Sequence, residues 1–358
     1  MIFNYIKSIL RRIRNVYFIK TKKVITNFTF GQIPYILQKG RLIRELKPGF
    51  ISTMTKSGTW YNRELFYFYN KLISGETSTE IIDNMISEKK KIRALIKSDY
   101  DKTGYDAFFI SHWGCPGFDR YNGKYKKEWD NLIFYNSYTY PSFLGQIPNR
   151  LTQKTMEKRY NTYYNWNPEK NNDARLVYLY RNPLDQSVSY FTSIQKMKLQ
   201  ELRYGINNQS EKILIKDVKD YIRTVGMDNY IKHYLPYTLM KEKYPDNFLL
   251  IQYESMVREP EKTFGDIFEF LEIDITRGDN MEYFQNAIQM SHKENIIKLE
   301  NAYGRSIANQ FLEDQTGERQ LRDGKISKWK NYFNSKDLEY INKRLNQFRL
   351  SLDDFTIE

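Results

Sequence analysis

The sequence predicts an α/β protein in which a central, mostly parallel sheet is covered by helices on both faces. Short apolar runs recur along the chain, and segments with helical spacing of apolar residues lie between them. Strands that alternate with helices in this way are typical of a parallel sheet buried on both sides. In such sheets, ligands bind beyond the carboxyl ends of the strands. The residues that follow each strand are therefore the first place to look for a functional site.

Four apolar runs are the predicted strands. They comprise residues 49–54, 107–111, 175–180 and 247–252. Polar residues follow each run at once, namely Lys56-Ser57, Ser111-His112, Arg181 and Tyr253-Glu254. We expect these groups to lie at one edge of the sheet, because the carboxyl ends of parallel strands meet there.

Helices are predicted after three of the strands. The first extends from about Thr59 to Leu72. The second follows the break at Asn182-Pro183 and runs from Leu184 to about Lys198. The third starts at Glu259-Pro260-Glu261 and ends at Leu271. A helical pattern also contains His233, for which we expect a structural role.

No linker rich in Pro, Gly and Ser divides the chain. We therefore expect a basic arm over residues 1–44 and a single domain over residues 45–358. Residues 113–174 and the polar residues 200–216 fit the strand–helix alternation less well. We interpret both segments as elaborations over the carboxyl edge of the sheet, where α/β enzymes select their substrates.

Composition excludes several classes of protein. The chain has 358 residues, of which 41% are hydrophobic and 16% aromatic, so it is too apolar to be disordered. Cys115 is the only cysteine and there are three histidines, which argues against disulfides and against a metal site built from these residues. No apolar run approaches about 18 residues and no signal peptide is visible, so we expect a cytoplasmic protein.

Positive charge is concentrated at the N-terminus. The net charge is +13, and the first 44 residues hold ten basic and no acidic side chains. This distribution predicts a basic arm on a nearly neutral domain and argues against a nucleic-acid binder. Apolar residues recur along the arm at helical spacing, at Phe3, Ile6, Leu10, Ile13 and Tyr17. Such a helix either lies on an anionic membrane surface, at the inner face of the membrane, or packs its apolar stripe on the domain.

The first motif is Lys56-Ser57-Gly58-Thr59, between a predicted strand and a predicted helix. Backbone N–H groups at a helix N-terminus bind anions, and Lys56 adds a point charge. Gly58 permits close approach, and the two hydroxyls are donors. The pattern differs from the Walker A loop, because the glycine follows the lysine instead of preceding it. The alternative is an ordinary N-cap turn without a ligand.

The second motif is Arg181-Asn182-Pro183-Leu184-Asp185, continued by Gln186-Ser187-Val188-Ser189-Tyr190. Pro183 can start a helix, which places Ser189 about two turns into it. An arginine fork and a nearby hydroxyl suit a phosphate monoester. The alternative is a strand-end arginine that pairs with Asp185.

In combination, these motifs resemble the cytosolic-type sulfotransferases, which use 3′-phosphoadenosine 5′-phosphosulfate (PAPS). Three further segments agree with this family in their order along the chain. Phe109-Ile110-Ser111-His112 resembles the strand end with the family's catalytic histidine. Leu250–Met256 with Glu259-Pro260 resembles its Tyr-Glu-Asp-Met segment. Leu321-Arg322-Asp323-Gly324, followed by 328–333, resembles its Arg-Lys-Gly signature. The resemblance covers about residues 49–350.

The resemblance implies a metal-free site in a P-loop-like fold. Four residues would hold the 5′-phosphosulfate: Lys56, Ser57, Gly58 and Thr59. Four would hold or close over the 3′-phosphate: Arg181, Ser189, Arg322 and Gly324. Trp60, Tyr253 and Ser291 would contact the nucleotide, although the adenine could stack on either Trp60 or Tyr61. His112 would be the general base for the acceptor hydroxyl, with Lys56 as the second catalytic residue.

The expected function is transfer of a sulfuryl group from PAPS to a hydroxyl. A glycan, a glycolipid or another surface-polymer precursor is the expected acceptor, with residues 113–174 on the acceptor side. The oligomeric state stays open. Two alternatives are a P-loop nucleotide kinase, which would need a magnesium carboxylate, and a non-catalytic basic adaptor at a membrane.

Overall fold

The computed structural model describes most of the domain from residue 49 onward. It describes residues 49–87, 175–196, 201–206, 209–303 and 325–357, with short pieces at 109–111, 114–115, 118, 127–128, 132 and 134–135. The strands are β1 (Gly49–Thr53), β2 (Phe109–Ser111), β3 (Phe134–Tyr135), β4 (Arg175–Tyr180), β5 (Glu201–Ile206), β6 (Gln209–Leu214) and β7 (Phe248–Gln252). The N-terminal arm lies outside the described residues.

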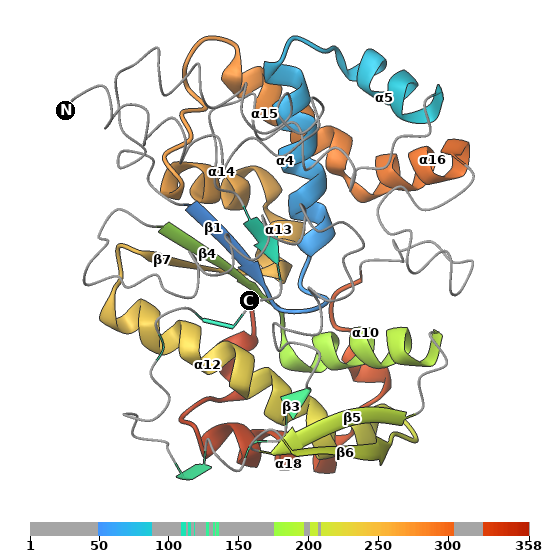
Figure 1. Cartoon of the computed structure of the whole chain (residues 1–358), viewed down its shortest axis with the longest axis vertical. Helices are drawn as coiled ribbons and strands as arrows, with labels where there is room; N and C mark the ends of the chain where they lie inside the picture. The colour runs from blue at the N-terminus through green and yellow to red at the C-terminus, as the bar shows by residue number, and fades with distance from the viewer. Residues whose placement is uncertain are drawn as a thin grey trace, which may run out of the picture.

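Helices follow most of the strands (Figure 1). The α-helices are α4 (Thr59–Ile73), α5 (Ser78–Ser87), α10 (Pro183–Lys196), α11 (Val218–Tyr221), α12 (Met227–Lys243), α13 (Tyr253–Arg258), α14 (Pro260–Phe270), α15 (Asn280–Ser291), α16 (Lys293–Tyr303) and α18 (Ser335–Asn346). A π-helical turn, η3 (Ile222–Gly226), precedes α12, and two 3₁₀ turns are η4 (Lys328–Asn331) and η5 (Leu352–Phe355).

The central sheet has the strand order β2-β1-β4-β7, and every neighbouring pair is parallel. All four predicted strands are therefore present and lie in one sheet, which confirms the predicted fold class. The register pairs Ser52 with Ser111 in β2 and with Tyr178 in β4. Across the β4–β7 pair, Tyr180 lies opposite Gln252. The carboxyl ends of all four strands therefore lie at the same edge.

Alternate residues of the strands enter two cores, one on each face of the sheet. Phe50, Leu176 and Tyr178 join the core that contains α12, whereas Ile51 and Val177 join the core that contains α4 and α14. Figure 1 shows α12 on one side of the sheet and α14 with α4 on the other. Strands β1 and β4, at the centre of the sheet, are buried from both sides, which is why their sequences are mostly apolar.

The predicted helices match the observed ones closely at their starts. Pro183 and Pro260 each occupy the first position of a helix, α10 and α14, where the missing N–H of proline costs nothing. The helix α4 begins at Thr59, as expected. Helix α12 contains His233, whose Nδ1 lies 2.8 Å from the hydroxyl of Tyr178. Its ring also stacks on Tyr178, in agreement with a structural role.

A second sheet is the main feature that the sequence did not predict. Strands β3, β5 and β6 form an antiparallel sheet, and β5 and β6 are joined as a hairpin across residues 207–208. The polar segment 200–216, interpreted as an elaboration at the carboxyl edge, is this hairpin. The small sheet contacts α12 through β3. Within the part of the chain that the structure describes, no helix is long and apolar enough to cross a membrane.

Candidate functional site

The loop between β1 and α4, residues 54–58, is called the Lys56 loop below. It turns sharply because Lys56 and Gly58 both adopt left-handed backbone conformations, with φ of 69° and 86°. The Ser57 N–H donates to the Met54 carbonyl at 3.2 Å, and the hydroxyls of Thr53 and Thr59 lie 2.8 Å apart across the loop. The loop therefore delivers the chain directly into the N-terminus of α4, which carries partial positive charge.

Gly58 has no room for a side chain. A Cβ at this position would lie 2.7 Å from Cδ2 of Tyr253 and 2.9 Å from Cε of Met256. Tyr253 and Met256 belong to α13, which directly follows β7. The glycine thus serves two purposes, because it permits a positive φ and lets the start of α13 pack on the loop.

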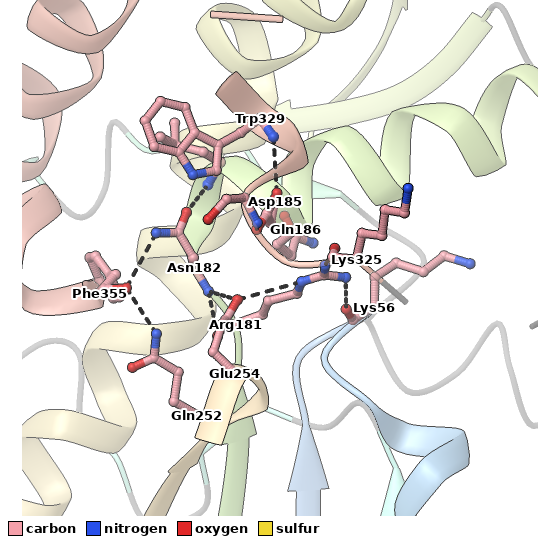
Figure 2. A network of polar contacts seen from close by, with 12 residues as sticks. Lys56, Arg181, Asn182, Asp185, Gln186, Gln252, Glu254, Lys325, Trp329 and Phe355 are labelled. Atoms are coloured by element: carbon pink, nitrogen blue, oxygen red, sulfur yellow. Dashed lines mark hydrogen bonds and ion pairs between the residues drawn. The ribbon is translucent and has the colours of Figure 1, made fainter. Parts of the chain in front are cut away.

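Arg181, at the end of β4, connects these strand ends (Figure 2). One terminal nitrogen donates to the Lys56 carbonyl at 3.4 Å, and the other donates to the Lys325 carbonyl at 3.1 Å. The guanidinium carbon lies 4.5 Å from the centre of the Tyr253 ring, and Nε lies 3.7 Å from Glu254 Oε1. Arg181 is only 7% exposed. A buried cation therefore stands where β1, β4 and β7 end.

Glu254 balances this cation in part. Its carboxylate also accepts hydrogen bonds from the Asn182 N–H, at 3.3 and 3.4 Å. Burial raises the pKa of Glu254 above its ordinary value, and the charge of Arg181 acts in the opposite direction. The Arg181–Asp185 pair, which was the alternative interpretation of the second motif, is not the arrangement found. Arg181 pairs with Glu254 instead.

Asp185 binds a different segment. Its two carboxylate oxygens accept the N–H groups of Ser327 and Trp329, at 2.6 and 3.0 Å. Ser327 adopts a left-handed conformation, and Trp329 lies in η4. Asp185 therefore anchors the chain that follows residue 324 to the first turn of α10. The neighbouring Lys325 carbonyl is the one that Arg181 holds.

The C-terminal residues reach the same strand ends. The Phe355 carbonyl accepts hydrogen bonds from Asn182 Nδ2 at 3.3 Å and from Gln252 Nε2 at 2.9 Å. The Phe355 ring is 1% exposed and lies against the rings of Tyr230 and Tyr234, with centroids 5.4 and 5.1 Å away. Figure 2 shows both amides converging on this carbonyl. A distant segment thus joins the ends of β4 and β7.

Several polar atoms at this edge are buried without a hydrogen-bond partner among the described residues. They are Ser57 Oγ, Arg181 Nε, Gln186 Oε1 and Ser187 Oγ. A buried polar atom without a partner costs free energy, so such atoms are suited to contact a polar ligand. Hydroxyl and guanidinium donors next to a lysine and a helix N-terminus suit a dianionic phosphate or sulfate.

The predicted site residues fall into three groups: those that converge at the edge of the sheet, those outside the described residues, and those that have separate environments. Lys56, Ser57, Gly58, Thr59, Arg181 and Tyr253 converge at the edge of the sheet. His112, Arg322 and Gly324 lie outside the described residues. The backbone of β2, which ends at Ser111 immediately before His112, pairs with β1 next to the Lys56 loop.

The other predicted contacts have individual environments. Ser189 lies half-buried on α10. Ser291 is buried at the end of α15, and its hydroxyl donates to the Ile288 carbonyl at 3.0 Å. Tyr61 packs edge-on against Phe264, with ring centroids 5.0 Å apart, and burial raises its pKa. Trp60 instead lies under the guanidinium of Arg63.

Sequence reasoning missed four residues that organise the site. Asn182 and Asp185 stand inside the second motif, so their positions were visible but their partners were not. Gln186 lies in the same motif, and its Nε2 donates to the Thr55 carbonyl at 3.1 Å. Phe355 carries no sequence signal, because its role depends on where the C-terminal segment packs.

Comparison with known proteins gives a consistent result. The family model described as "Sulfotransferase domain" matches residues 47–348. Flavonol 3-sulfotransferase of Flaveria bidentis is 25% identical over 181 residues, which are 50% of this chain and 55% of that protein. Amine sulfotransferase of Oryctolagus cuniculus is 23% identical over 233 residues, 65% of this chain and 72% of that protein. The chain thus spans about half the length of the plant relative.

Solved structures give a weaker likeness. A mouse sulfotransferase complexed with PAP is 15% identical and has a TM-score of 0.44, with 87% of this chain and 90% of that chain covered. A sulfotransferase from Mycobacterium avium has a TM-score of 0.39 at 15% identity, covering 91% of this chain and 81% of the other.

Proposed function

This chain belongs to the sulfotransferase domain family, and on that basis we propose that it transfers a sulfuryl group from PAPS to an acceptor hydroxyl. The observation that carries the proposal is the convergence of the Lys56 loop, Arg181 and Tyr253 at the carboxyl edge of the sheet. Family membership supports neither the kinase nor the adaptor alternative. The described residues contain no cluster of potential metal ligands.

The donor residues of this edge fit the two charged ends of PAPS. The Lys56 loop and the N-terminus of α4 would hold the 5′-phosphosulfate, with Ser57 Oγ as a further donor. Arg181 would hold the 3′-phosphate together with Ser189, Arg322 and Gly324. Arg181 already contacts the Lys325 carbonyl, which places the chain after Gly324 beside it. Tyr253 would contact the nucleotide from the side of β7.

Sulfuryl transfer requires a positive charge at the bridging oxygen and a base for the acceptor hydroxyl. PAPS supplies the activated sulfuryl group, which moves in line to the acceptor oxygen. Lys56 would place positive charge beside the bridging oxygen, where negative charge develops. His112, which follows β2 directly, would accept the proton of the acceptor hydroxyl. Its replacement by alanine should leave nucleotide binding intact and lower turnover by about 10²-fold or more.

A thermal-shift titration tests the donor assignment. Adenosine 3′,5′-bisphosphate (PAP) should raise the melting temperature, whereas ATP with magnesium should not. A ligand at 100 times its dissociation constant adds about 2.7 kcal/mol to the free energy of unfolding. Stabilisation by ATP with magnesium alone would favour a kinase. Stabilisation by neither nucleotide would favour a non-catalytic role.

We further propose an acceptor at a surface: a glycan, a glycolipid or another polymer precursor. The support is the Tyr-rich segment 113–174, which can stack on sugar rings or line an apolar groove, and the basic arm over residues 1–44. Both lie largely outside the described residues. Incubation with ³⁵S-labelled PAPS and separate lipid and glycan extracts would identify the acceptor. Label that enters only small phenols would contradict this proposal.

The arm itself can be tested by deletion of residues 1–28. Each basic residue near an anionic membrane contributes about 1 kcal/mol, and salt screens this attraction within about 10 Å at 0.1 M. The full-length protein should therefore sediment with anionic vesicles at low salt, and the deletion variant should not. If the full-length protein ignores the vesicles and the deletion lowers the melting temperature, the arm packs on the domain.

A further inference from the structure

Two side chains of the segment after β4 hold two consecutive carbonyls of the Lys56 loop. Gln186 Nε2 donates to the Thr55 carbonyl at 3.1 Å, and an Arg181 terminal nitrogen donates to the Lys56 carbonyl at 3.4 Å. Arg181 also contacts Lys325, Glu254 and Tyr253, so it has several tasks. Among the described residues, the Gln186 amide has its hydrogen bond with the loop alone.

Gln186 stands on a firmly anchored element. It lies in the first turn of α10 and is 6% exposed. Its neighbour Asp185 is bonded to the N–H groups of Ser327 and Trp329, and Asn182 is bonded to Glu254 and Phe355. The helix start is therefore fixed to three other segments. A donor on a rigid element positions its partner more accurately than a donor on a loop does.

The contact fixes the direction of a peptide group. Because a peptide is planar and trans, its C=O and the following N–H point in opposite directions. Holding the Thr55 carbonyl at Gln186 therefore makes the Lys56 N–H point away from Gln186. It also restrains Lys56, whose φ of 69° is a conformation that a non-glycine residue rarely adopts. Figure 2 shows the Lys56 side chain extending away from the Arg181 network.

We propose that Gln186 is a positioning residue for sulfuryl transfer, which holds the Lys56 loop in the shape that binds the 5′-phosphosulfate. This inference rests on the proposed function. The side-chain hydrogen bond of Gln186 is made with the Lys56 loop, whereas Arg181 is the residue proposed to hold the 3′-phosphate. Its loss should therefore weaken ligands with a 5′ group and leave ligands with only a 3′-phosphate unchanged.

Three nucleotides separate the two ends of the site. PAP carries both phosphates, adenosine 5′-phosphosulfate carries only the 5′ group, and 3′-AMP carries only the 3′-phosphate. Gln186→Glu keeps the size of the side chain but removes the N–H donor. Gln186→Leu removes both polar atoms. Ser193→Ala is the matched control, because Ser193 is a buried residue of the same helix that donates to a main-chain carbonyl away from the loop.

Titration calorimetry on folded variants gives the test. Both Gln186 variants should bind PAP and adenosine 5′-phosphosulfate about tenfold more weakly than the unaltered protein, with 3′-AMP affinity unchanged within about twofold. Ser193→Ala should bind all three like the unaltered protein. Equal weakening of all three ligands, or no weakening of the 5′ ligands, would overturn the inference. So would failure of both variants to fold, because Gln186 would then serve the fold.

The unaltered protein distinguishes this inference from its premise. If it binds PAP and adenosine 5′-phosphosulfate but the Gln186 variants behave like it, only the positioning role is wrong. If the unaltered protein binds neither nucleotide, the proposed function itself is wrong, and the role of Gln186 falls with it.

Discussion

Among the glycines that the structure describes, Gly58 combines a left-handed backbone with the closest packing around its Cα. Its φ is 86°, and a Cβ would collide with Tyr253. Gly75 offers a comparison, because its φ is 89° but a Cβ added there would have no atom within 4 Å. The two glycines therefore separate the effect of conformation from the effect of packing.

Gly58→Ala should destabilise the protein more than Gly75→Ala. Both substitutions place alanine in a left-handed conformation, which costs about 1–2 kcal/mol. Only Gly58→Ala adds overpacking, which costs about a further 1–3 kcal/mol. Urea unfolding of the two variants measures the difference, and PAP titration should show weaker binding for Gly58→Ala alone. Equal destabilisation would show that Tyr253 moves aside freely.

The proposed role of Arg181 in binding the 3′-phosphate can be tested by comparing ligands with and without that group. Arg181→Leu should weaken PAP by about 10- to 100-fold, the range for loss of a charged hydrogen-bonding group. The affinity for adenosine 5′-phosphosulfate, which lacks the 3′-phosphate, should fall by less than about fivefold, a limit of about 1 kcal/mol, because the 3.4 Å contact of Arg181 with the Lys56 carbonyl is longer than the 3.1 Å contact of Gln186 with the loop. Calorimetric titration of both ligands gives the ratio. Equal losses would mean that Arg181 serves the fold through Glu254 and the two carbonyls.

At the residue scale, the sequence predicted which side chains lie at one edge of the sheet, and their contacts with a nucleotide stay predictions. Lys56, Arg181 and Tyr253 were predicted together because each follows a strand, and parallel strands end at one edge. The partners of Asp185 could not be predicted, because Ser327 is 142 residues away in the chain. An aspartate at this position could either pair with an arginine or accept main-chain N–H groups, and only the fold shows which of the two roles Asp185 has.

At the scale of elements, α4 contains an unusual buried acid. Glu64 is 1% exposed, and its pKa is raised by burial and by the nearby Glu300 of α16, itself buried. A raised pKa in the folded protein favours the protonated acid. The contribution of Glu64 to stability is therefore present below its ordinary pKa of 4.5 and is lost as pH rises through the higher folded value.

Glu64→Gln should accordingly stabilise the protein relative to the unaltered chain at higher pH, with an advantage that grows as pH rises above the ordinary pKa of 4.5. Glu80→Gln is the control, because the pH dependence of stability expected from Glu80 is opposite to that expected from Glu64. Hydrogen bonds from Thr77 lower the pKa of Glu80, so its contribution is lost as pH falls. Urea unfolding at several pH values measures both. An advantage of Glu64→Gln that shrinks as pH rises would contradict this assignment.

The elements of the central sheet were predictable, whereas those of the small sheet were not. Strands buried on both faces have continuous apolar runs, such as residues 176–180 of β4, and these runs were recognised. The hairpin strand Gln209–Leu214 contains Ser, Glu and Lys, so it lacks this signal. Its pairing with Glu201–Ile206 depends on cross-strand hydrogen bonds, which are independent of side-chain polarity.

Across the whole molecule, the C-terminal segment completes the core beside the site. Phe355→Ala should lower the free energy of unfolding by about 3–5 kcal/mol, the cost of removing a fully buried phenylalanine. Tyr332→Ala removes the side chain of a residue that is 44% exposed and should change the free energy of unfolding by less than about 0.5 kcal/mol. Chemical denaturation tests both variants. Similar values for the two would show that the Phe355 pocket closes without its ring.

The contact between Asn182 and Phe355 can form only late in the synthesis of the chain. The two residues are 173 positions apart, and a ribosome adds about 5–20 residues per second. Phe355 is therefore translated roughly 9 to 35 s after Asn182, the residue at the end of β4 that it contacts. During that interval the Asn182 amide lacks its Phe355 partner, as does the Gln252 amide once it has been translated, so protection by chaperones matters most after the sheet strands have emerged and before residue 355 has been translated.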